Sequence, residues 1–262
     1  MGYENLRFEA SQGVARITLQ RPDAANTIDL ALARELADAA LRCAEDPTVR
    51  AVVLTGEGKM FCAGGDIGAF AGAGDGVPAL LKQITAQLHV AVSRFARMNA
   101  PLIAAVNGPA AGAGLALACA ADLALASDAA KFTMAYTKIG LAPDGSSTWF
   151  LPRLVGTRRS LELMLTNRTL SAEEALAWGL VNRVVPAAAL LGEAESLARE
   201  LAAGATGAFG AVKRLLLLSA GQGLEAQMEW EAHAIADAAR SRDGSEGIAA
   251  FLAKRAPRFE GR

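Results

Sequence analysis

The chain has 262 residues, of which 52% are hydrophobic and 5% aromatic, and it carries 26 Lys and Arg against 27 Asp and Glu. This length suits one large domain, or one domain with an appendage. The balanced charge and the scarcity of aromatic rings exclude a general nucleic-acid-binding surface, and the apolar runs are too short to span a membrane.

The cysteines and histidines further limit the class of protein that this sequence can encode. Cys43, Cys62 and Cys119 lie in apolar or small-residue segments and cannot all pair, which favours buried free thiols in a reducing compartment. No basic segment followed by an apolar one opens the chain, so we expect a cytoplasmic location. The only histidines are His89 and His233, and no Cys-x-x-Cys occurs, so we expect no metal site.

The N-terminal part predicts strands that alternate with helices. Apolar and polar residues alternate over 6–19 around a Gln12-Gly13 turn, which predicts a hairpin. Helical spacing over 32–43 follows, with Asp29 as its cap. The apolar run 51–55 is typical of a buried strand.

A long helix is predicted from Pro78, and His89 lies at the edge of its apolar face. A packing role is the simplest interpretation of such a lone histidine. The glycine-rich segment 71–76, just before this helix, predicts a mobile loop. Either an exposed connector or a flap over a ligand would explain it.

Two strand-to-helix turns are built from small residues. The strand 102–106 ends at Asn107-Gly108-Pro109, and only small residues follow before the helix 115–121. Amides at such a helix start lack internal partners and carry partial positive charge, which predicts an anion site made of backbone. Close helix–sheet packing explains the small residues equally well. The segment 61–67, also between a strand and a helix, predicts further amides beside the first set.

Asp144 has two interpretations. It follows two predicted strands, 123–126 and 131–135, and precedes a predicted helix over 148–154. An aspartate among serines and glycines before a helix is commonly a cap. The alternative is a functional carboxylate.

The pattern changes near residue 190. A capping box at Ser171 and a stop at Gly179 delimit a short helix, and 181–185 is the last predicted strand. Only helices follow, at 190–203, 207–219, 224–240 and 246–255. We therefore predict an α/β core of residues 1–189 and a helical oligomerisation region of residues 190–262.

Taken together, the motifs resemble the crotonase superfamily over nearly the whole chain. They are Arg21-Pro22-Asp23-Ala24-Ala25-Asn26, Ala63-Gly64-Gly65-Asp66, the turn after Val106, Pro143-Asp144-Gly145 and Ala250-Phe251-Leu252-Ala253-Lys254-Arg255. The resemblance implies a crotonase-like ββα spiral with two roughly perpendicular sheets and a C-terminal helical trimerisation region. It also implies homotrimers or hexamers. The implied substrates are coenzyme A thioesters, with no separate cofactor, metal, membrane or nucleic acid.

The resemblance also implies an oxyanion hole, formed by the backbone amides of Ala63 and Ala113. The implied substrate-binding residues are Ala63, Gly64, Gly65, Asp66, Ile67, Ala113, Tyr136, His89 and Lys254, the last as a phosphate contact. The two glutamates of the enoyl-CoA hydratases fall on Ala116 and Tyr136. Ordinary two-glutamate hydration is therefore not expected.

Within the superfamily the chain is similar to the isomerase subgroup of aerobic phenylacetate breakdown. Lys131-Phe132-Thr133-Met134-Ala135 followed by Pro143-Asp144 carries this similarity, and it implies that Asp144 is the catalytic acid and base. The expected activity is an enoyl-CoA isomerisation, by a double-bond shift or a ring-epoxide rearrangement.

Three alternatives remain. One is an enoyl-CoA hydratase that uses Asp144 alone, and another is a catalytically silent acyl-CoA-binding protein. The third is a dehalogenase, because the segment 162–170 resembles the 4-chlorobenzoyl-CoA dehalogenases. Those enzymes align an aspartate nucleophile with Asp144 and a histidine with His89, but their two aryl-binding tryptophans fall on Leu88 and Tyr136. We rank dehalogenation below isomerisation and hydration.

Overall fold

The computed structural model describes residues 2–261, and the strands within that range form two sheets. The larger sheet has six strands, in the order β1 (Leu6–Ser11), β2 (Val14–Leu19), β3 (Ala51–Gly56), β4 (Leu102–Val106), β6 (Leu123–Ser127) and β9 (Arg183–Val185). The smaller sheet has three, β5 (Ala110–Ala111), β7 (Lys131–Thr133) and β8 (Leu170–Ser171). The predicted hairpin is confirmed, because β1 and β2 pair antiparallel.

The rest of the larger sheet is parallel, and this explains its short apolar strands. Along β3, alternate side chains enter two separate apolar clusters: Val52 and Leu54 face one, while Ala51 and Val53 face the other. The sheet therefore has a buried face on each side.

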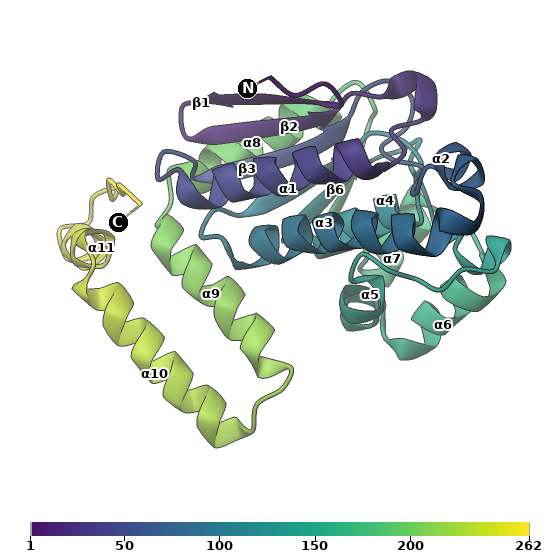
Figure 1. The fold of residues 1–262 in the computed structure, drawn as a ribbon. Coiled ribbons are helices and arrows are strands. Elements are labelled where there is room, and N and C mark those ends of the chain that lie inside the picture. Colours follow the sequence, from purple (N-terminus) through teal and green to yellow (C-terminus); the bar gives the residue numbers. More distant parts are fainter. Residues whose placement is uncertain (1, 262) are drawn as a thin grey trace.

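Helices cover both faces of this sheet (Figure 1). On one side α1 (Leu30–Glu45) packs against α3 (Val77–Arg97), and the Asp29 carboxylate accepts the Leu32 amide at 2.8 Å, as predicted for a cap. On the other side α8 (Leu190–Ala202) buries its small apolar stripe against β3, β4 and β6. The predicted boundary between a core of residues 1–189 and a helical region of residues 190–262 stays a prediction. Helix α8 lies after that boundary in the chain but packs on the sheet of the core.

Five shorter helices lie around the smaller sheet and the carboxyl ends of the parallel strands, namely α2 (Ile67–Gly72), α4 (Ala113–Ala120), α5 (Ser147–Val155), α6 (Thr157–Thr166) and α7 (Ala172–Trp178). All residues of α4 are buried, as expected for a helix that is apolar all round. The capping box at Ser171 and the stop at Gly179 are confirmed. The segment 71–76, predicted as a mobile loop, is instead the end of α2 and a 3-10 turn.

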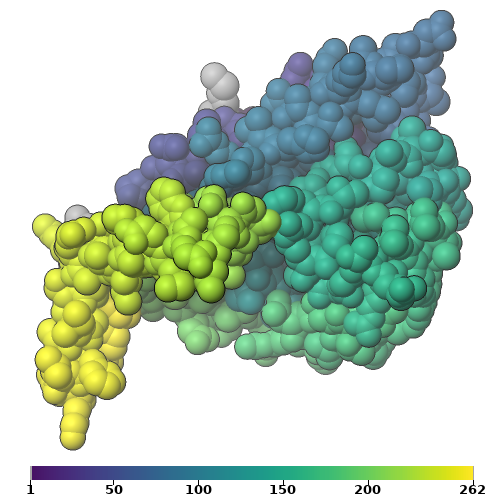
Figure 2. All heavy atoms as spheres, turned by 90° about the horizontal axis from the view of Figure 1, so that it is seen from below, coloured from purple at the N-terminus to yellow at the C-terminus, as the bar shows by residue number. Residues whose placement is uncertain are grey.

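The remaining helices form an arm that projects from the body, made of α9 (Thr206–Ser219), α10 (Leu224–Arg240) and α11 (Arg242–Leu252) (Figures 1 and 2). Helix α9 contacts α3 of the core and then pairs with α10. No residue of α10 is buried. Within residues 2–261 no single helix is long and apolar enough to cross a membrane, although α8 and α9, bent by 102°, pass that test as a pair.

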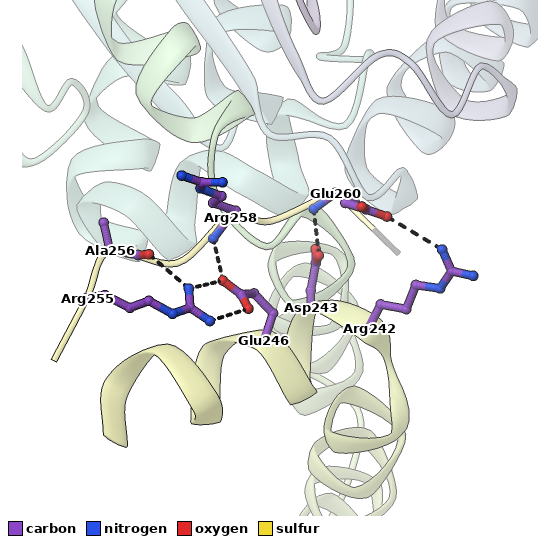
Figure 3. A pocket seen from close by; sticks show the side chains of 7 residues that line it. All are labelled: Arg242, Asp243, Glu246, Arg255, Ala256, Arg258 and Glu260. Atoms are coloured by element: carbon purple, nitrogen blue, oxygen red, sulfur yellow. Dashed lines mark hydrogen bonds and ion pairs between the residues drawn. The ribbon is translucent and has the colours of Figure 1, made fainter. Parts of the chain in front are cut away.

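The C-terminal tail, residues 255–261, folds back over α11 (Figure 3). Asp243 accepts the amides of Glu260 and Gly261 at 2.7 and 2.8 Å, and Glu246 pairs with the Arg255 guanidinium at 2.6 Å. Arg50, just before β3, donates to the Phe259 carbonyl at 2.9 Å. The surface hollow of about 680 Å³ seen in Figure 3 is thus lined by charges that already bind one another.

Candidate active site

Two turns made of small residues meet where β3 and β4 end. The Ala111 amide donates to the Cys62 carbonyl at 2.9 Å, which joins the turn after β3 to the turn before α4. Gly64 lies between them with φ +98°, and a Cβ there would come within 2.9 Å of the Ala111 oxygen. Only glycine fits this position, because both the dihedral and the space exclude a side chain.

The backbone amides at this junction correct one prediction. Ala63 donates its N–H to the Ala25 carbonyl at 3.0 Å, so that amide is already bonded. The amides of Gly65 and Ala113, by contrast, have no hydrogen-bond acceptor among residues 2–261, and both residues line one cavity. The pair of free donors is therefore Gly65 and Ala113, in place of Ala63 and Ala113.

The cavity lined by Gly65 and Ala113 has a volume of about 330 Å³, and we call it the central cavity. Its walls are mainly apolar side chains from α2, α3 and the segment before α1: Ile28, Ile67, Phe70, Leu81, Ile84 and Leu88. Sequence reasoning assigned the α3 members to the core face and missed their second role. Thr85 and Lys138 also line the cavity, and nothing in the sequence pattern singled them out.

Asp144 is the one carboxylate among the described residues that lines the central cavity. Its Oδ1 accepts the Tyr136 hydroxyl at 2.5 Å. The N-cap of helix α5 is instead Ser146, which has φ +68° and makes no side-chain cap, while the Asp144 carbonyl accepts the Ser147 amide. The cap interpretation of the Asp144 carboxylate is wrong, because that carboxylate faces Tyr136 and the cavity.

Tyr136 is half-buried, and its phenol is held in the protonated form. Burial is the main cause that raises the pKa of Tyr136, and the neighbouring Asp144 charge raises it further. The hydroxyl therefore stays a proton donor throughout the usual pH range.

Seven of the predicted site residues line the central cavity: Ala63, Gly64, Gly65, Ile67, Ala113, Tyr136 and Asp144. Asp66 has a supporting position beside it. Its carboxylate accepts the Ala69 amide at 3.0 Å as the cap of α2 and pairs with Arg21 at 3.1 Å. The Ala69 amide and then Arg21 lower the pKa of Asp66.

Two predicted residues lie elsewhere. His89 is exposed on α3 and lines a separate hollow of about 420 Å³ with Trp149 and Phe150, because it points away from the buried stripe of its helix. Lys254 is exposed just after α11, on the opposite side of the molecule from α2 (Figure 1). Within one chain neither side chain is brought to the central cavity.

The fold, with this apolar cavity, its two free backbone amides and its one carboxylate, is that of the crotonase class of proteins. Residues 9–262 match the family model described as enoyl-CoA hydratase/isomerase, and the chain belongs to this family. A structure of a putative enoyl-CoA hydratase/isomerase from Mycobacterium abscessus matches with TM-score 0.92 and 39% identity, covering 98% of this chain and 100% of that one.

Relatives of the chain carry different names. A probable enoyl-CoA hydratase from Rhodobacter capsulatus is 40% identical over the whole of both chains. The 1,2-epoxyphenylacetyl-CoA isomerase of Escherichia coli is 39% identical over 99% of each. A 4-chlorobenzoyl coenzyme A dehalogenase from Arthrobacter is 38% identical over 95% of this chain and 91% of its own. The chain is therefore an enzyme of this family, and its particular reaction has to be argued from its own site.

Proposed function

We propose that the chain is an enoyl-CoA isomerase in which Asp144 moves a proton between two carbon atoms of the acyl group. One observation carries the proposal: Asp144 is the one carboxylate, among residues 2–261, in a cavity that also holds the free amides of Gly65 and Ala113.

The proposed reaction needs one acid/base group and one anion site. The Asp144 carboxylate takes a proton from the carbon next to the thioester carbonyl or its vinylogue, and the electron pair moves onto the carbonyl oxygen. The amides of Gly65 and Ala113 stabilise that oxygen, and one such donor contributes about 3 kcal/mol to lowering the barrier. For an enoyl substrate, Asp144 then returns the proton two carbons away, so substrate and product differ only in where the double bond lies.

A second carboxylate that could bind water has no place in this cavity. At the position of one hydratase glutamate the chain has Ala116, which is fully buried. A Cβ on Gly145 would lie 3.1 Å from the Cβ of Ala116, so the turn that carries Asp144 occupies the adjacent space. At the other glutamate position Tyr136 donates to Asp144 and keeps its proton at neutral pH, so it does not act as a base.

The substrate is proposed to be an acyl-CoA with an apolar acyl group. The apolar walls of the central cavity support this, and the name of the Escherichia coli relative makes a ring-epoxide thioester a leading candidate. Lys254 is proposed to reach a coenzyme A phosphate from a neighbouring subunit, since it is far from the cavity of its own chain. A cytoplasmic location is part of the proposal, supported by three buried free thiols.

Hydration by Asp144 alone is the second candidate, favoured by the name of the Rhodobacter capsulatus relative. Dehalogenation has less support, because the exposed His89 lies outside the central cavity.

A panel of 3-enoyl, 2-enoyl and ring-epoxide CoA thioesters tests the proposal. We expect the 3-enoyl or the ring-epoxide substrate to isomerise, and the 2-enoyl substrate to take up no water at a comparable rate. Hydration of the 2-enoyl substrate without any isomerisation would replace the proposal by the second candidate. Binding of all three without turnover would leave the dehalogenase and the silent acyl-CoA-binding protein.

A further inference from the structure

The hydrogen bond between Tyr136 and Asp144 is short, and Tyr136 is its donor. The phenol donates to Oδ1 of Asp144 at 2.5 Å, and the raised pKa of Tyr136 means that this hydroxyl does not give up its proton. A donor to a carboxylate stabilises the charged form, and a charge-assisted bond is roughly twice as strong as a neutral one.

Backbone hydrogen bonds on both sides of Tyr136 fix the position of its side chain. The Tyr136 amide donates to the Met134 carbonyl at 2.7 Å, which makes a three-residue turn around Ala135 at φ +55°. The Tyr136 carbonyl accepts the Leu141 amide at 3.1 Å. A left-handed alanine costs free energy that the surrounding structure has to offset, and such residues cluster at functional sites.

The backbone on the Asp144 side is equally constrained. The Asp144 carbonyl accepts both the amide and the hydroxyl of Ser147, at 3.1 and 2.8 Å, and Ser147 is fully buried. Gly145 and Ser146 follow with φ +59° and +68°. Two turns that lie eight residues apart thus bring one phenol to one carboxylate.

We propose that Tyr136 is a positioning residue for Asp144: it occupies Oδ1 and leaves Oδ2 as the oxygen that carries the proton. This inference rests on the proposed function, because it assumes that Asp144 is the proton carrier. It adds to the substrate-binding role that the sequence predicted for Tyr136, which also lines the central cavity.

Few other titratable groups surround this pair. Cys62 lies close enough to raise the pKa of Tyr136 further, and Lys138 lines the central cavity. His89 shares its separate hollow with Ser146, two residues from Asp144. A change in kcat that follows the loss of the phenol hydroxyl can therefore be compared with a matched change at His89, outside the central cavity.

The test compares Tyr136→Phe, Asp144→Asn and the double variant on the thioester that the wild type isomerises. Tyr136→Phe keeps the ring, removes only the hydroxyl, and is expected to lower kcat about 10- to 100-fold with KM unchanged. A loss confined to kcat indicates that the hydroxyl positions Asp144 and does not bind substrate. His89→Gln, outside the central cavity, should leave both kcat and KM unchanged.

The double variant shows whether Tyr136 acts through Asp144 or independently of it. Residues that act as a unit give non-additive losses, so adding Tyr136→Phe to Asp144→Asn should cost little more. Wild-type kcat in Tyr136→Phe would overturn the positioning role while leaving the proposed function intact, as would a loss confined to KM. Full activity in Asp144→Asn would overturn the proposed function itself.

Discussion

At the scale of single residues, the site depends on which main-chain amides the fold leaves without an acceptor. The Ala63 amide is bonded to Ala25, while Gly65 and Ala113 present theirs to the central cavity. A Cβ on Gly65 would lie 2.7 Å from the Phe70 ring, so that turn is tightly packed and tolerates no larger residue. Ala113 is the more accessible position for a test.

Ala113→Pro is expected to remove one oxyanion donor with little other change. Ala113 is the first residue of α4 after Gly112, and proline is well tolerated at the first position of a helix. Turnover should fall about 10²- to 10³-fold. Steady-state kinetics and a melting curve check this, with Ala113→Gly, which keeps the amide, as the matched control that should retain turnover. Equal turnover in the proline and glycine variants would show that this amide does not act.

At the scale of elements, a buried ion pair fixes the arm to the core. Lys213 of α9 pairs with Asp122 at 2.7 Å and donates to the Phe95 and Ala100 carbonyls at 2.9 and 3.0 Å. Burial is the main cause that lowers the pKa of Lys213 and raises that of Asp122. Both shifts reflect the cost of removing the two charges from water.

Lys213→Met should therefore destabilise the protein by about 3–5 kcal/mol, because it leaves a buried carboxylate without its cation. Urea unfolding at fixed protein concentration measures the loss. Adding Asp122→Asn removes the unpaired charge and keeps an acceptor for the Leu102 amide, so the double variant should recover part of the stability. A Lys213→Met variant as stable as the wild type would mean that the pair does not hold α9.

The elements that the sequence predicted well are those with local signals. The Asp29 cap, the capping box at Ser171 and the hairpin depend on residues close together in the chain. Helix α6 was missed because six of its ten residues are charged or hydroxylated, so few apolar residues mark its buried face.

The errors at the site have a different cause. The bond from Ala63 to Ala25 and the one from Tyr136 to Asp144 depend on how separate turns meet in space. Spacing along the chain carries no such information, so the family resemblance predicted the right turns but the wrong amide. The sequence placed His89 at the edge of the buried face of α3, but its side chain is exposed. Neighbouring residues on a helix point in different directions, so Leu88 is buried while His89 is not.

At the scale of the whole molecule, the arm leaves large apolar side chains uncovered. Within the described residues, Ile235 is 73% exposed, Phe251 84% and Leu252 76%. Monomeric proteins rarely leave so much apolar surface on one projection, which supports a proposed trimer or a dimer of trimers.

Sedimentation at micromolar concentration tests the proposed assembly. We expect three or six copies, because burying the arm of each chain against a neighbour removes its apolar surface from water. Ile235→Glu keeps a good helix former in α10 and should weaken the association, whereas Glu225→Gln on the same helix should not. A wild-type protein that sediments as a monomer would refute the assembly.

The measurement that bears most directly on the account is the turnover of Asp144→Asn on the thioester panel. Asn still accepts the Tyr136 hydroxyl, so the melting temperature should barely change, and the amides of Gly65 and Ala113 should keep substrate affinity. The Asn side chain does not exchange a proton at neutral pH, so turnover should fall about 10²- to 10⁴-fold. Wild-type turnover on every thioester would contradict the account, because the carboxylate in the central cavity would then carry no proton.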